Sequence, residues 1–116
     1  MILIVADNPG MRELLVRSLT HHEFQIATAS DGGSGLLQFG LTQPDLVLLD
    51  VAGYEVLKRI RELSTVPVIT FADLYDQNAK IQYLNNGADY CLDKPVGVAE
   101  LRARIWALFR REKLPS

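Results

Sequence analysis

Three side chains capable of phosphate or metal chemistry lie next to short apolar runs that have the length of buried strands. Asp7 follows "ILIVA", Asp50 ends "LVLLD", and Lys94 follows "DYCLD" directly before a proline. Carboxylates bind hard cations, and a lysine ammonium can hold phosphoryl oxygens. One carboxylate at a strand end is most often an ordinary turn residue. Together, the three would suit a phosphoryl group held by lysine beside a cation held by carboxylates.

Apolar runs and amphipathic patterns alternate along the chain and must position these side chains. Strands are expected at 2–6, 24–29, 46–50, 66–72 and 89–93, and helices at 11–19, 33–41, 54–63, 76–87 and 98–112. Each strand–helix–strand step crosses over right-handed, so the pattern predicts a doubly wound α/β fold with five parallel strands and five helices. Sites in such sheets lie at the carboxyl ends of the strands, where Asp7, Asp50 and Lys94 are expected.

Length and composition restrict the class of protein. With 116 residues the chain fits one domain, and its net charge of −2 gives no overall nucleic-acid-binding footprint. The single cysteine, Cys91, excludes an internal disulfide and fits a reducing compartment. The apolar runs are too short to cross a membrane. We therefore expect a cytoplasmic protein without a membrane partner.

The ordered segments "ILIVADNPGMRELLVRSL", "PDLVLLD", "EVLKRIREL", "NNGADYCLDKP" and "ELRARIWALFRR" resemble the receiver domain of bacterial two-component response regulators. The "GAD" segment and the last helix look closest to the OmpR/PhoB type. The resemblance implies a flavodoxin-like sheet of order 2-1-3-4-5, with the receiver over 1–112 and a linker starting at 113–116. It also implies that Asp50 matches the phosphoacceptor and Lys94 the invariant lysine. A DNA-binding effector domain would then lie outside this chain.

Four positions depart from the pattern of that family. The usual acidic pair after the first strand is Ala6–Asp7 here, and the Ser or Thr that ends the fourth strand is Ala72. Thr70 could replace that hydroxyl only if the strand register slipped. The aromatic switch position three residues before the lysine is Cys91. The loop after Asp50 is "VAG", about five residues shorter than the resemblance implies.

These losses weaken the expected phosphorylation chemistry. Mg²⁺ needs near-octahedral oxygen ligation, so Asp7 and Asp50 predict a metal site that is weak or absent, with no other cofactor. The family's metal also takes a carbonyl that matches Ala52, which a three-residue loop is expected to misplace. Phosphoryl transfer depends on positioning and charge neutralisation, and one lost donor costs roughly 100- to 1000-fold in rate. We therefore expect no enzyme activity.

The resemblance also implies a homodimer through the fourth helix, the fifth strand and the fifth helix. Charges of both signs suit a self-complementary two-fold interface, and the expected interface residues are Lys80, Asp89, Glu100, Arg104, Trp106 and Arg111. Trp106 is included because it falls off the apolar stripe of its helix, and Trp is enriched in interface hot spots. His21 and His22 are expected to end the first helix.

Three functions remain open at this stage. The leading hypothesis is an atypical receiver that acts without phosphorylation, as a signalling and dimerisation module in transcription regulation. The second is a conventional receiver phosphorylated on Asp50 by a sensor kinase, with Asp73 or Asp93 supplying a further carboxylate. The third is a small-ligand sensor that uses the space left by Ala6 and Ala72.

Overall fold

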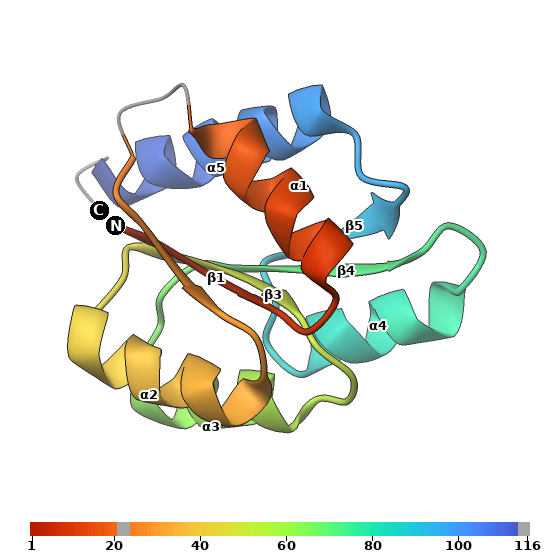
Figure 1. The fold of residues 1–116 in the computed structure, drawn as a ribbon. Helices are drawn as coiled ribbons and strands as arrows, with labels where there is room; N and C mark the ends of the chain where they lie inside the picture. Colours follow the sequence, from red (N-terminus) through yellow and green to blue (C-terminus); the bar gives the residue numbers. More distant parts are fainter. Residues whose placement is uncertain (21–23, 114–116) are drawn as a thin grey trace.

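A parallel sheet lies between two layers of helices in the computed structural model, which describes residues 1–20 and 24–113 (Figure 1). Strands β1 to β5 span Ile2–Ala6, Ile26–Ala29, Leu46–Asp50, Val68–Asp73 and Tyr90–Lys94. Helices α1 to α5 span Pro9–Leu19, Gly32–Thr42, Glu55–Leu63, Gln77–Asn85 and Val98–Lys113. The strands pair in the order β2-β1-β3-β4-β5, which confirms the predicted topology.

Some expected features fall outside the described residues. They are the pair His21–His22 and residues 114–116 of the expected linker. Within the described part of the chain, no helix is both long and apolar enough to span a membrane.

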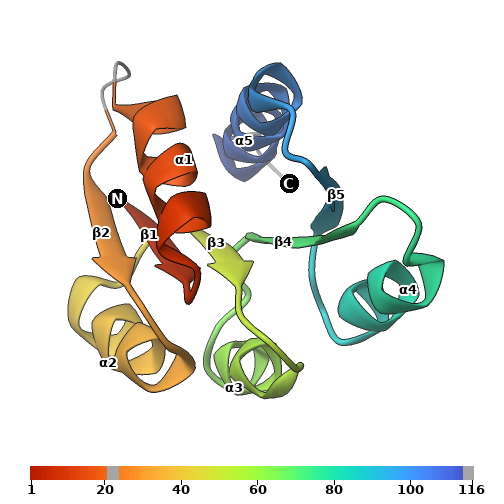
Figure 2. The same ribbon diagram turned by 45° about the vertical axis from the view of Figure 1, so that its right-hand side comes forward.

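Alternating side chains of the central strands build one core on each face of the sheet. Helices α1 and α5 cover one face, and α2, α3 and α4 lie on the other (Figure 2). In β1, Ile2 and Ile4 face the α1–α5 core, while Leu3 and Val5 face the core beneath α2 and α3. This alternation explains why β1 and β3 are apolar throughout, since a central parallel strand is buried on both faces.

Helices α1, α2 and α4 each have a side-chain N-cap. Asn8, Asp31 and Asp76 each accept a hydrogen bond from a backbone N–H three residues further on, at 2.8–3.0 Å. Pro9 occupies the first turn of α1, where its fixed φ fits the helix. The hydrogen bond from the Ser34 N–H also lowers the pKa of Asp31, because it stabilises the carboxylate.

Arg61 on α3 connects the amino-terminal ends of β4 and β5. Its guanidinium donates to the carbonyl oxygens of Gly87 at 2.7 Å and Val66 at 2.6 Å, and it forms an ion pair with Asp89 at 3.0 Å. Asp89 also accepts the Val68 N–H at 2.8 Å. This corrects the expected role of Asp89, because its carboxylate is engaged inside the chain and is not free for a dimer salt bridge.

Trp106 also differs from its expected place. Its ring lies 5.2 Å from the Phe24 ring, just before the edge strand β2, whereas Arg104 lies 4.6 Å over the Tyr90 ring on the opposite edge strand β5. Residues two apart on a helix point in nearly opposite directions. Trp106 therefore faces away from the expected α4–β5–α5 interface, a direction that the apolar stripe alone did not reveal.

We predict that Arg61→Met lowers the free energy of unfolding by about 2 kcal/mol, since it leaves Asp89 and two carbonyls without their partner. Urea denaturation measures this change. The matched control is Arg59→Met on the same helix, where the Glu62 ion pair is more than half exposed and the expected change is below about 0.5 kcal/mol. Equal effects of the two variants would contradict the role given to Arg61.

Candidate functional site

The register of the sheet brings the predicted residues together at the carboxyl ends of the strands. Ala6 pairs with Asp50 across β1 and β3, and Asp73 pairs with Lys94 across β4 and β5. The Asp7 N–H lies 3.4 Å from the Asp50 carbonyl oxygen. Asp7, Asp50 and Lys94 all line a pocket of about 310 Å³ at the carboxyl ends of the strands. The structure thus brings together the three side chains singled out from the sequence.

A short ion pair connects Asp50 and Lys94. Lys94 Nζ lies 2.8 Å from Asp50 Oδ1, and the Asp50 side chain is 10% exposed against 35% for Lys94. Asp50 is the one charged residue that the described core buries. A buried carboxylate needs a partner, because desolvation otherwise disfavours its charge. Lys94 supplies that partner and occupies one oxygen of the expected phosphoacceptor.

Two positions around Asp50 carry methyl groups where the resemblance leads one to expect polar atoms. Ala6 is fully buried beneath α1 and α5, and Ala72 lines the pocket. Thr70 does not replace the missing hydroxyl, since its Oγ1 is fully buried and donates to the Tyr90 carbonyl oxygen at 3.4 Å. The strand register has therefore not slipped, and Ala72 holds the position predicted for it.

The short turn after Asp50 is held against α4 by aromatic contacts. Gly53 adopts φ +82°, a left-handed conformation that favours glycine, and it allows the chain to enter α3 at once. Tyr54 then packs edge-on against Tyr83 of α4, with ring centroids 4.9 Å apart. The Tyr83 hydroxyl also makes a long contact of 3.5 Å with the Val51 carbonyl oxygen. Tyr83 thus lines the pocket and contacts the turn that would hold a metal in the related domains.

Neighbouring polar groups of β5 face α4. Lys80 forms an ion pair with Asp93, so the carboxylate considered as a spare metal ligand is engaged. Burial raises the pKa of the Cys91 thiol, which keeps it in the neutral form. Cys91 therefore acts as a small apolar residue where an aromatic switch was expected.

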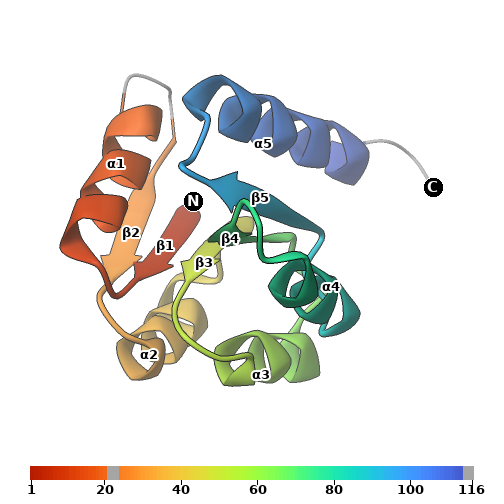
Figure 3. The same cartoon turned by 90° about the vertical axis from the view of Figure 1, so that its right-hand side faces the viewer.

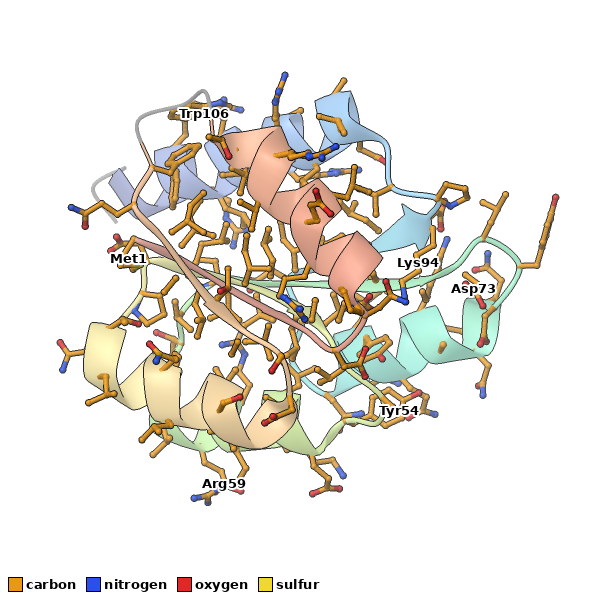
Figure 4. The ribbon with its side chains drawn as sticks, viewed as in Figure 1. Met1, Tyr54, Arg59, Asp73, Lys94 and Trp106 are labelled. Carbon is orange, nitrogen blue, oxygen red and sulfur yellow. The ribbon has the colours of Figure 1, made fainter. Side chains whose placement is uncertain are left out.

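The described residues present no preformed cluster of three ligating side chains for Mg²⁺. The pocket is lined by four carboxylates, Asp7, Asp50, Asp73 and Asp76, yet no three ligating side chains among the described residues are grouped closely enough to hold a metal ion. Asp50 already contacts Lys94. Asp73 pairs with Lys94 across the ends of β4 and β5, and Figure 4 shows Asp73 near the loop that leads to α4.

Sequence reasoning missed Tyr54, Tyr83 and Arg12. Arg12 in the first turn of α1 donates to the Ala6 carbonyl oxygen at 2.8 Å and brings a second cation to this region. The four-residue spacing of Ala79 and Tyr83, which share one helix face, is the signal that could have placed Tyr83 at the pocket. No local signal pairs it with Tyr54, because that contact joins two helices.

Comparison with protein families gives a match over most of the chain. The family described as "Response regulator receiver domain" matches residues 2–106. Among curated relatives, "Probable transcriptional regulator ycf27" of Cyanophora paradoxa is 38% identical over 99% of this chain and 50% of its own length. "KDP operon transcriptional regulatory protein KdpE" of Escherichia coli is 35% identical over 95% of this chain and 51% of its own length. This chain therefore spans about half the length of these relatives.

Solved structures agree with the fold. A putative response regulator from Chloroflexus aurantiacus is 30% identical with a TM-score of 0.87, covering 92% of this chain and 94% of its own. A two-component response regulator from Clostridium difficile has a TM-score of 0.91 at 24% identity, over 97% and 98% of the two chains, and supports the fold alone.

We predict that Tyr83 titrates at a higher pH than an ordinary tyrosine. Burial, followed by the charges of Tyr54 and Asp50, raises its pKa. Because the folded state holds this proton more tightly, the stability from Tyr83 is complete below pH of about 10 and is lost as pH rises through the raised pKa. Alkaline absorbance titration should lose a step above the ordinary tyrosine range in Tyr83→Phe, whose stability should also fall less steeply with pH. An unchanged titration above that range would contradict this assignment.

Proposed function

The chain belongs to the response regulator receiver domains, and from that premise we propose that it is an atypical member that signals without phosphorylation of Asp50. In this proposal it serves as a dimerisation module of the OmpR/PhoB type in transcription regulation. The observation that carries the proposal is the 2.8 Å ion pair of the Asp50 and Lys94 side chains, beside a connection of only four residues, 51–54, between β3 and α3.

The charge of the pocket supports this proposal. Four carboxylates and one ammonium line it, so an incoming phosphoryl group, itself an anion, meets a surplus of negative charge. In metal-assisted phosphoryl transfer a divalent cation neutralises this repulsion. With Ala6 and Ala72 in place of polar groups, the described residues offer little to replace it. We infer that the chain has neither a Mg²⁺ cofactor nor enzymatic activity of its own.

The length of the relatives supports a role in transcription. KdpE of Escherichia coli and AfsQ1 of Streptomyces coelicolor are both named transcriptional regulators, and this chain covers about half of each. We propose that any DNA contact of this protein is made by an effector domain outside the present chain. A sensor kinase remains a candidate partner in the cytoplasm. In this proposal the kinase would signal to the chain by binding it and not by transferring a phosphoryl group.

The proposed dimer face lies on α4, β5 and α5. Lys80 pairs with Asp93, and Arg104 lies 3.7 Å from Glu100 and stacks on Tyr90. The exposed Arg104–Glu100 pair contributes little within one chain, so its charges remain available to a second copy. The Lys80 side chain is 19% exposed and has to release Asp93 to reach a second copy. Two large apolar side chains of α4 are about half exposed beside them, Ile81 and Leu84. Arg111 is exposed on the same side of α5, seven residues after Arg104.

Two other functions are kept as alternatives. In a conventional receiver, Asp50 would have to release Lys94 and accept a phosphoryl group. The Mg²⁺ that assists this transfer would be bound only weakly. A small-ligand sensor would use the pocket of about 310 Å³, which is at the small end of the range for ligand sites.

We predict that acetyl phosphate with Mg²⁺ leaves the wild-type chain without a stoichiometric phosphate adduct, because the charge at Asp50 is not neutralised by a metal. Intact-mass spectrometry measures the adduct, and Asp50→Asn provides the blank. The double variant Ala6→Asp, Ala72→Thr restores one carboxylate and one hydroxyl, so it should label at least about tenfold more than the wild type. Stoichiometric labelling of the wild type that Asp50→Asn abolishes would contradict the proposal.

The dimer is tested separately. Sedimentation velocity should show a concentration-dependent dimer without phosphodonor, and Arg104→Glu should weaken it by about tenfold or more, since like charges then meet across the two-fold axis. Arg59→Glu is the control, because Arg59 lies on α3 on the other side of the molecule (Figure 4). A monomer at all concentrations, or equal loss in the two variants, would contradict this interface.

A further inference from the structure

A second cleft, larger than the Asp50 pocket, lies at the end of the sheet opposite Asp50. It has a volume of about 810 Å³ and is bounded by α5, the start of β2 and the loops that lead into β3 and β4. Figure 4 shows Trp106 and Met1 at this end and Lys94 at the other, while Figure 3 shows α5 crossing above the sheet. The cleft shares no lining residue with the Asp50 pocket, so it needs a separate explanation.

Three aromatic rings form one wall of the cleft. Trp106 lies 5.2 Å from Phe24 and 6.2 Å from Phe109, with interplanar angles of 42° and 79°. These tilted contacts fix the orientation of the indole, while 46% of Trp106 stays exposed. Since Trp106 faces away from the proposed dimer face, that interface does not account for its exposure. Trp is also the aromatic residue that binds cations best through its ring face.

The opposite wall is polar and acidic. Asp45 is the one charged side chain among the described lining residues, and Ser64 and Thr65 add hydroxyls. Asp45 Oδ2 accepts a hydrogen bond from the Met1 ammonium at 2.9 Å. The Met1 ammonium also lines the cleft and partners this carboxylate, whose side chain is 72% exposed. Asp45 therefore accepts an ammonium group at this position.

Hydrogen bonds keep this second wall in place. Ser64 Oγ accepts the Val66 N–H at 3.0 Å, and Arg61 donates to the Val66 carbonyl oxygen. The Asp45 N–H donates to the Met1 carbonyl oxygen at 2.8 Å. A preformed wall loses little conformational entropy when a ligand binds.

We propose that this cleft binds a small organic cation with an apolar or aromatic body. The cationic group lies between Asp45 and the face of Trp106, and the body covers the aromatic wall. The negative ring face of Trp106 favours a cation over an anion of the same shape, and the volume fits a compact organic molecule. The Met1 ammonium competes for the same carboxylate.

Trp106 is the only tryptophan in the sequence, so its fluorescence reports on this cleft directly. The probes are benzyltrimethylammonium and phenylacetate, which carry the same ring and opposite charges. We expect a saturable fluorescence change with the cation and at least tenfold weaker binding of phenylacetate. Asp45→Asn should abolish this preference, and acetylation of the Met1 amine should tighten binding of the cation.

Asp50→Asn is the matched control, because it removes a carboxylate from the other pocket and should leave the titration unchanged. Circular dichroism verifies that Asp45→Asn remains folded. No saturable change, equal responses to the two probes, or full binding by Asp45→Asn would each overturn the proposal. A Trp106 signal that changes with protein concentration alone would assign the cleft to a second copy of the chain and would overturn it as well.

Discussion

The short connection between β3 and α3 determines which groups surround Asp50 at the carboxyl ends of the strands. Residues 51–54 connect the end of β3 to α3, one residue more than the three expected from the sequence, and Gly53 allows this short connection through its left-handed backbone. Such a short connection places Tyr54 directly against Tyr83 and leaves no loop to extend over the pocket. The position of Asp50 is set by the register of β3, so the strand is preserved while its surroundings change. In the proposed function, this short connection separates the scaffold of a receiver domain from phosphorylation of Asp50.

The charged groups around Asp50 are positioned by the strand ends and by this connection. The buried carboxylate of Asp50 has Lys94 as its cationic partner at 2.8 Å. Arg12 lies nearby through its bond to the Ala6 carbonyl oxygen. The helix that contacts this pocket, α4, has no fully buried residue. Its attachments include the Tyr83 contacts and the Lys80–Asp93 ion pair, so the pocket and the proposed dimer face share one lightly anchored helix.

Much of the fold could be predicted because its signals are local. Continuous apolar runs identified β1 and β3 to the residue, and alternation with helical patterns predicted five parallel strands and five helices. The order of the strands came from the resemblance to receiver domains. The second strand was predicted two residues too long at its start, since Phe24 contributes its apolar character to the aromatic wall on α5 instead of to the strand. For the site, Asp7, Asp50 and Lys94 converge as the strand ends implied. The partners of Asp89 and Trp106 were not predictable, because each contact joins residues far apart in the sequence, and periodicity does not give the direction of an exposed side chain.

The central claim is that Asp50 is held by Lys94 and does not assemble a metal-dependent phosphoryl site. The most direct measurement is an NMR titration of the amide resonances of residues 50–53 with Mg²⁺, with and without beryllofluoride as a phosphoryl analogue. We predict no saturable shift at these amides in either titration, while the folded spectrum is retained. A saturable shift centred on residues 50–53, enhanced by beryllofluoride and abolished by Asp50→Asn, would contradict the account.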